Sequence, residues 1–243
     1  MIERGEVLVK KKKPVKVRQQ KRRKKRPYFL LLLLAAGGWL FIKNSVPTLS
    51  PFDWFNHKDS VVEVAFVREV NQHLEMTQGG MPLILQKDER WYYEAYGTEN
   101  SNNYMGVNGC ALASLAMMGS FWQERYIDPV EILGWAQNNY YLSGQGTTWR
   151  IFNDYAHAIG MTSQDLGNDF ATAKNFMTLG YPVIVSVKPG YFTEVGHIMV
   201  LRADAAGDIV VYDPNDSPDK RHYAQTFSDE LLLNESINYW VYQ

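Results

Sequence analysis

The sequence contains a single cysteine, Cys110, which lies directly after Gly109 and opens a run of small and apolar residues. A thiol at the N-terminal end of a helix is close to backbone N–H groups and to the positive end of the helix dipole, and both favour the thiolate. The thiolate is the form of cysteine that attacks a carbonyl carbon. Cys110 is therefore a candidate nucleophile. The alternative is a small core residue, because unpaired cysteines are among the most buried side chains.

A histidine and an aspartate further along the chain could activate this thiol. His197 begins one apolar run and Asp213 follows the next, with Ala-Ala-Gly-Asp at 205–208 between the two runs. This composition predicts a turn between two strands. Antiparallel pairing outward from the turn places Asp213 beside His197. A carboxylate that orients an imidazole is the arrangement that a general base needs in nucleophilic catalysis.

Each of these residues also has an ordinary structural explanation. A histidine at a strand end is often a core or surface residue. An aspartate before proline, as in Asp213-Pro214, often ends a strand with its carboxylate bonded to local backbone. Asn215 is the alternative partner for the histidine if Asp213 points away. Gln86 could donate to an oxyanion together with the backbone N–H of Cys110, or it could be an amide at a strand edge.

The order of the expected elements predicts an α+β fold, because the helices come first and the strands follow, which favours an antiparallel sheet. Asp128 before Pro129 has the pattern of a helix N-cap followed by proline at the first helical position. The expected helices cover 110–121, 129–138, 148–159 and 170–179, and the expected strands cover 182–188, 196–203, 208–212 and 237–242.

The charge is distributed unevenly along the chain. Residues 1–27 hold 13 Lys/Arg and two Glu, a net charge of +11, whereas the rest holds 12 Lys/Arg and 24 Asp/Glu, a net charge of −12. Like charges at the density of the first segment prevent a core, so we expect 1–27 to be a disordered tail. An acidic body argues against nucleic-acid binding.

An uncharged apolar segment follows the basic one. Residues 28–42 carry no charge, and the aliphatic stem of Lys43 could extend the apolar length to residue 46. Basic residues directly before such a segment are typical of a cytoplasmic flank. We therefore expect one transmembrane signal-anchor helix at 28–46, in contact with the lipid bilayer, with the N-terminus in the cytoplasm and the remaining chain outside. A cleaved signal peptide is the alternative.

Residues 47–80 are expected to form a stalk that leads to a folded domain at 81–243. Prolines near its start and a Gly-Gly pair at its end interrupt regular structure. Within it, 61–70 fits either a strand or an amphipathic helix. The five histidines are scattered without the spacing of metal ligands, and one cysteine cannot form a disulfide within the chain, so neither a metal nor another cofactor is expected.

Together these motifs resemble the C39-like family of cysteine peptidases. The resemblance extends from residue 82 to the C-terminus, about two thirds of the chain. It rests on Gln86-x-Asp88-x-Arg90-Trp91, Tyr96-Gly97, Gly109-Cys110 at the head of a small-residue helix, Gly196-His197 before an apolar strand, and Tyr212-Asp213-Pro214. It implies a papain-like fold, in which a central helix carries the nucleophile and an antiparallel sheet carries the histidine and the aspartate.

By position, the resemblance assigns Cys110 as the nucleophile, His197 as the general base, Asp213 as the residue that orients it, and Gln86 as the oxyanion donor. It implies a membrane-anchored peptidase that cleaves a peptide or protein substrate outside the membrane through an acyl-enzyme. The chain departs from the family at Ala111-Leu112, where members often have Gly-Pro. It also lacks the ATP-binding and multi-span parts of bacteriocin exporters, so leader cleavage coupled to export is not expected.

A second function class stays open at this point. The chain could be a membrane-tethered module that keeps the papain-like fold without turnover and binds peptides or glycans. Surface aromatic side chains would serve that function, and the candidates are Trp91-Tyr92-Tyr93 and Tyr140-Tyr141. The two classes differ in geometry, because a hydrolase needs the Cys110 thiol open to solvent and in contact with His197.

Overall fold

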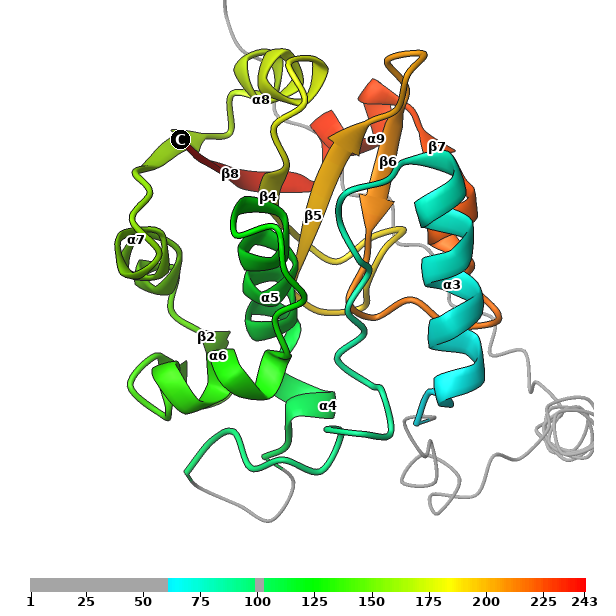
Figure 1. Cartoon of the computed structure of the whole chain (residues 1–243). Helices are drawn as coiled ribbons and strands as arrows, with labels where there is room; N and C mark the ends of the chain where they lie inside the picture. The colour runs from blue at the N-terminus through cyan, green and yellow to red at the C-terminus, as the bar shows by residue number, and fades with distance from the viewer. Residues whose placement is uncertain (1–60, 99–102) are drawn as a thin grey trace, which may run out of the picture. The chain divides into compact units, whose positions relative to one another are not determined.

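The computed structural model describes residues 61–98 and 103–243 (Figure 1). The expected tail at 1–27, the expected membrane helix at 28–46 and the first part of the expected stalk lie outside the described residues. Every helix within the described ranges is too short or too polar to cross a bilayer.

A six-stranded antiparallel sheet forms the centre of the described chain. Its spatial order is β3-β8-β4-β5-β6-β7, so the last strand of the sequence lies between two earlier ones. The strands are β3 (Ser163–Gly167), β4 (Val183–Val187), β5 (His197–Ala203), β6 (Ile209–Tyr212), β7 (Thr226–Phe227) and β8 (Ser236–Tyr242). The α+β class and the antiparallel sheet predicted from the sequence are confirmed.

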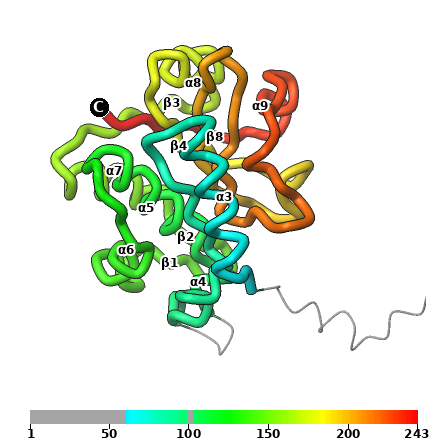
Figure 2. Tube along the Cα trace, turned by 45° about the vertical axis from the view of Figure 1, so that its right-hand side comes forward, coloured from blue at the N-terminus to red at the C-terminus, as the bar shows by residue number. Residues whose placement is uncertain are grey.

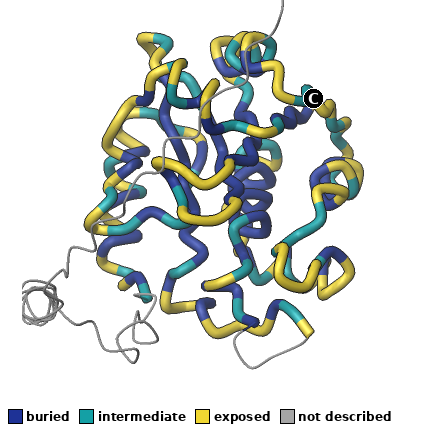
Figure 3. Tube along the Cα trace, turned by 180° about the vertical axis from the view of Figure 1, so that it is seen from behind, coloured by how far each residue is buried: buried dark blue, intermediate teal, exposed yellow. Residues whose placement is uncertain are grey.

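Helices cover both faces of this sheet, and alternate strand residues point to opposite faces. Ile184, Ile198 and Val200 belong to one apolar core with the helices α3 (Val64–Thr77) and α5 (Cys110–Trp122). Val185 and Met199 belong to a second core with α8 (Phe170–Thr178) and α9 (Asp229–Glu235). Figure 3 shows the result: buried residues concentrate in the strands and in the central helix, and exposed residues lie mostly on the loops.

The central helix α5 is buried from Ala111 to Ser120. A helix that is apolar on all sides belongs in a protein interior, and Ala, Leu and Met also favour the helical backbone. The short helix α4 (Met105–Asn108) leads directly into it. Only glycine fits at the junction, because a Cβ at Gly109 would lie 2.4 Å from the carbonyl oxygen of Met105. The nucleophile candidate therefore follows a close backbone contact.

The remaining helices agree with the sequence to within a few residues. They are α6 (Pro129–Ala136) and α7 (Arg150–Ala158), and the Asp128 side chain accepts a hydrogen bond from the Val130 N–H, as an N-cap does. A small hairpin of β1 (Tyr141–Leu142) and β2 (Gly146–Thr147) joins them. The elements expected from the sequence did not include α4, β1, β2, β3, β7, α9 or the short 3₁₀ helix η1 (His222–Ala224).

Helix α3 corrects the expected domain boundary. The segment that fitted either a strand or a helix is a helix, and its apolar face holds Phe66, Val70 and Leu74 at a spacing of four residues. These side chains are buried in the same core as α5. Figure 2 shows α3 lying along the sheet, in the same compact unit as the strands. The expected stalk at 47–80 is therefore wrong over α3, which is part of the folded domain.

One close contact between helices gives a test of this packing. A Cβ at Gly119 of α5 would lie 2.3 Å from the Tyr155 hydroxyl oxygen and 2.7 Å from Ile127 Cδ1, and both side chains are buried. We expect Gly119→Ala to lower the free energy of unfolding by about 1–3 kcal/mol, measured by urea denaturation. The matched control is Gly134→Ala in α6, where a Cβ meets nothing within 4 Å. It should leave the stability unchanged or raise it by up to about 1 kcal/mol. Equal effects of the two substitutions would contradict the packing argument.

Candidate active site

Cys110 lies at the wall of a groove of about 910 Å³. The thiol is partly buried and is placed there by the first turn of α5, while His197 lines the same groove from the first residue of β5. The Ser114 hydroxyl donates to the Ile198 carbonyl at 3.4 Å and helps to hold the helix against the strand. The helix start and the strand start therefore bring the two side chains together.

The predicted pair of histidine and aspartate is present. In the β5–β6 ladder Val200 is opposite Tyr212, which brings the next residue, Asp213, back toward the start of β5. His197 Nε2 lies 2.7 Å from Asp213 Oδ1. Nε2–H therefore donates to the carboxylate, and the other ring nitrogen is left for the thiol, with which His197 also forms a hydrogen bond.

The electrostatics of the three groups favour a thiolate–imidazolium pair. Burial alone would raise the pKa of the Cys110 thiol, but the His197 hydrogen bond and charge, with the N–H groups of Ile198 and Ala111, hold the pKa below its usual value. Burial alone would lower the pKa of His197, but the charge and hydrogen bond of Asp213 raise it to about 9. At neutral pH the imidazole is therefore protonated and the thiol is activated.

Asp213 stays ionised although its side chain is fully buried. Burial raises the pKa of a carboxyl group, but His197, His222 and Lys220 together hold the pKa of Asp213 well below its usual value. The backbone N–H of Asn215 also donates to Oδ1 at 2.7 Å. The alternative in which Asn215 replaces Asp213 is therefore not what the structure shows, since Asp213 itself faces the histidine.

Gln86 is buried behind the site. Its Nε2 donates to the Gly106 carbonyl at 3.1 Å, its backbone N–H donates to Pro214 at 2.8 Å, and it does not line the groove. Its buried Oε1 has no hydrogen-bond partner among the described residues. Gln86 thus joins the segment before α5 to the turn after Asp213, and its role as an oxyanion donor stays a prediction.

His222 is a residue of the site that the sequence analysis missed. Its Nδ1 lies 2.9 Å from Asp213 Oδ2, and its side chain is 5% exposed. An isolated histidine in a loop gives no local signal, and only the fold brings it to the carboxylate. In the described part of the chain, no group of three or more His, Cys, Asp or Glu side chains has the geometry of a metal site.

The groove offers an almost uncharged surface. Among the described residues that line it, none is an aspartate, glutamate or lysine, and the single arginine is Arg150. Arg150 forms an ion pair with Asp154. Exposed apolar side chains lie along it, namely Val107, Leu142, Trp149, Val195 and Ile237. Of the candidate binding aromatics, Trp91, Tyr92 and Tyr140 are buried, whereas Tyr93 is exposed and Tyr141 lines the groove.

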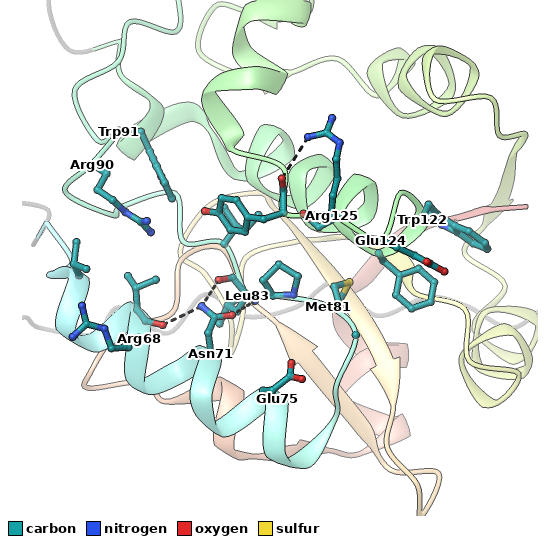
Figure 4. Close-up of a pocket in the computed structure, with 18 residues that line it drawn as sticks. Arg68, Asn71, Glu75, Met81, Leu83, Arg90, Trp91, Trp122, Glu124 and Arg125 are labelled. Carbon is teal, nitrogen blue, oxygen red and sulfur yellow. Dashed lines mark hydrogen bonds between the residues drawn. The ribbon is translucent and has the colours of Figure 1, made fainter.

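A second, larger cavity of about 1080 Å³ lies between α3 and the end of α5 (Figure 4). Its walls carry Arg68, Asn71 and Glu75 on one side and Trp122, Glu124 and Arg125 on the other. The Asn71 side chain exchanges two hydrogen bonds with the backbone of Leu83 and is therefore structural. This cavity shares no lining residue with the groove at Cys110. We assign the candidate active site to the smaller groove because the thiol and imidazole are there.

Solved structures that resemble this chain include three peptidase domains or proteases. The peptidase domain of Streptococcus ComA, a bifunctional ABC transporter involved in a quorum sensing pathway, is 20% identical; the match covers 62% of this chain and 96% of that domain, with a TM-score of 0.43. A double glycine motif protease from an AMS/PCAT transporter, in complex with the leader peptide, is 15% identical, with 55% and 82% covered and a TM-score of 0.40. The Streptococcus mutans ComA peptidase domain with a small-molecule inhibitor is 19% identical, with 62% and 99% covered and a TM-score of 0.36.

No curated protein matches the sequence. The profile of the Peptidase C39 like family matches residues 80–242, which is more than half of the chain and contains Gln86, Cys110, His197 and Asp213. The chain therefore belongs to the Peptidase C39 like family.

Proposed function

We propose that this protein is a cysteine peptidase that cleaves peptide amide bonds through an acyl-enzyme on Cys110. The observation that carries the proposal is the contact of Cys110 with His197 at the wall of an open groove, with Asp213 Oδ1 at 2.7 Å on the far side of the imidazole. A thiol sealed in the core would have favoured a binding module without turnover. The family membership adds independent support for peptidase chemistry.

The chemistry follows from the ionisation of the three residues. The Cys110 thiolate attacks the amide carbonyl carbon, and the resulting oxyanion accepts a hydrogen bond from the backbone N–H at the start of α5, which has no partner inside the helix. The tetrahedral intermediate collapses as the C–N bond breaks and the His197 imidazolium gives its proton to the leaving amine. Water then attacks the thioester, His197 takes its proton, and the carboxylic acid product leaves the regenerated thiol.

The groove favours one class of substrate. The groove is lined by apolar and uncharged polar side chains, and its one arginine is already paired, so a charged substrate side chain loses hydration there without gaining an ionic partner. An extended peptide segment with small or apolar side chains on both sides of the scissile bond fits this lining best. This substrate class is narrower than the one expected from the net negative charge of the residues after 1–27, which favours basic or neutral substrates.

Substrate profiling of the full chain tests the proposal. Wild-type protein in detergent micelles is incubated with a peptide library, and the new termini are identified by mass spectrometry. We expect cleavage between small or apolar residues, a transient thioester on Cys110, and a rate at least about 10³-fold lower for Cys110→Ala. Cleavage at the same sites and rates by Cys110→Ala would contradict the mechanism, as would a folded wild-type protein that forms neither product nor thioester.

We propose further that the domain is held outside the membrane by the helix at 28–46, with 1–27 in the cytoplasm. This proposal is supported only by the sequence pattern of basic residues followed by an uncharged apolar segment.

A further inference from the structure

The carboxylate of Asp213 is held at both of its oxygens. Oδ1 accepts from His197 Nε2 at 2.7 Å and from the Asn215 N–H at 2.7 Å, while Oδ2 accepts from His222 Nδ1 at 2.9 Å. Lys220 Nζ lies 3.6 Å from Oδ2. Asp213 is fully buried, so these contacts replace the water that would otherwise solvate its charge. Two histidine rings therefore bracket one carboxylate.

The backbone around His222 is fixed by a second buried carboxylate. Asp216 accepts from the N–H groups of His222 at 3.0 Å and Tyr223 at 2.9 Å. Arg221, the preceding residue, has a left-handed φ of 50°, a conformation that is strained in a non-glycine residue. Its guanidinium bonds to Glu69 of α3 at 2.7 Å. The chain thus accepts a strained turn that directs the His222 ring inward.

Aromatic rings fix the orientation of the His222 side chain. Tyr191 stacks on it with the ring centroids 5.6 Å apart, and Phe192 and Phe227 meet it edge-on at 5.5 and 5.6 Å. The ring does not line the groove, so it does not reach a substrate. Its contact with the site passes through Asp213 alone.

We propose that His222 is a positioning residue of the active site, which donates Nδ1–H to Asp213 Oδ2 and so fixes the carboxylate in the plane that presents Oδ1 to His197. This inference rests on the proposed function. With Oδ2 held, the carboxylate cannot rotate away from the imidazole, and it stays ionised down to lower pH. The hydrogen-bonded chain of side chains then runs from Cys110 through His197 and Asp213 to His222. These residues lie on α5, on β5, at the end of β6 and on η1, respectively.

A matched pair of substitutions separates this hydrogen bond from the shape of the side chain. Asn and Leu have almost the same shape, but only Asn can donate from near the position of Nδ1. Because Cys110 is the single cysteine, the intact mass after iodoacetamide treatment reports the reactivity of this thiol alone. The rate is measured in the full chain from pH 4 to pH 10. The titratable groups that face this network are Cys110, His197, His222, Lys220, Asp213 and Asp216, together with Tyr191, which stacks on His222.

We expect His222→Leu to lower the alkylation rate at pH 6 about tenfold and to move the acid limb of the profile up by about one pH unit, because a carboxylate that is free to rotate stabilises the His197 imidazolium less, and the imidazolium in turn stabilises the Cys110 thiolate less. His222→Asn should restore the rate to within about threefold of wild type. With a cleavable peptide, kcat should fall for the Leu variant while KM stays unchanged, since His222 does not touch the groove.

Three results would overturn the inference: a folded Leu variant with the wild-type profile, equal losses in the Leu and Asn variants, or ¹⁵N NMR of the wild-type ring that finds Nδ1 of His222 without a proton. The NMR measurement decides the question even if the Leu variant does not fold. Failure of the proposed function looks different, because Cys110 would then alkylate as an ordinary thiol in the wild-type protein as well as in both His222 variants.

Discussion

Replacing His197 with alanine is expected to lower the alkylation rate of Cys110 at pH 6 about 30-fold and peptide hydrolysis at least about 10³-fold. Burial raises the pKa of the Cys110 thiol, and in the wild type the His197 imidazolium outweighs this effect. Without His197 the effect of burial is no longer outweighed. A thiol with a pKa of about 8.5 is only about 0.3% thiolate at pH 6, a loss of about 300-fold. The higher nucleophilicity of the more basic thiolate offsets about tenfold of that loss. Hydrolysis falls further because the general acid and base are also gone.

The pH profile identifies the cause. In the wild type the ion pair persists until His197 loses its proton, and the pKa of His197 is about 9. Its stabilisation of the thiolate is therefore complete below that pH and is lost as the pH rises through it. The His197→Ala profile should follow a simple thiol titration and approach the wild-type rate above about pH 10. His157→Ala, an exposed histidine on α7, is the matched control and should keep the wild-type profile. Superimposed profiles for wild type and His197→Ala would contradict the ion pair.

A chain that begins at residue 80, where the family match begins, is expected to lose its cooperative thermal transition. Such a chain lacks α3, which buries Phe66, Val67, Val70 and Leu74 in the core shared with α5. Burial of each side chain contributes about 1.5–3 kcal/mol, so the four together contribute roughly 6–12 kcal/mol. This is comparable to the entire stability of an ordinary domain, about 5–15 kcal/mol.

Circular dichroism of chains that begin at residue 57 and at residue 80 checks this expectation. A point substitution gives a milder version: Leu74→Ala should lower the free energy of unfolding by about 2–5 kcal/mol. Met76→Ala is its control, because Met76 is 80% exposed, and the change should stay within about 0.5 kcal/mol. Equal melting temperatures for the two chains would show that α3 is dispensable.

The sequence predicted the parts of the site that depend on local structure. The start of α5 at Cys110 follows from a run of helix-forming residues after glycine, and the N-cap at Asp128 follows from its own side chain. The pairing of His197 with Asp213 follows from one short turn, which fixes the register of two adjacent strands. In each case the decisive interaction joins residues that are close in the sequence, so a local sequence pattern is enough to predict it.

Other features depend on contacts between distant segments. The apolar pattern of α3 fits a strand as well as a helix, and only its packing against the core decides between them. Gln86 was predicted to be an oxyanion donor from its residue type and its position in the sequence. Its observed amide contact with the Gly106 carbonyl depends on how two segments of the chain pack together. His222 is 25 residues after His197 in the sequence and reaches the same carboxylate only through the fold of η1. No spacing rule could have selected it.

The strand order has a consequence for the way the protein is made. β8 is the last strand in the sequence, yet it pairs with β3 on one side and β4 on the other. Until β8 has been synthesised, β3 has no neighbour in the sheet, and β4 lacks one of its two. Trp240 and Val241 also complete the two apolar cores from opposite faces of the same strand. Cys110, His197 and Asp213 are thus all translated before the sheet that supports them can close, so an emerging chain gains an ordered site only once β8 has followed them.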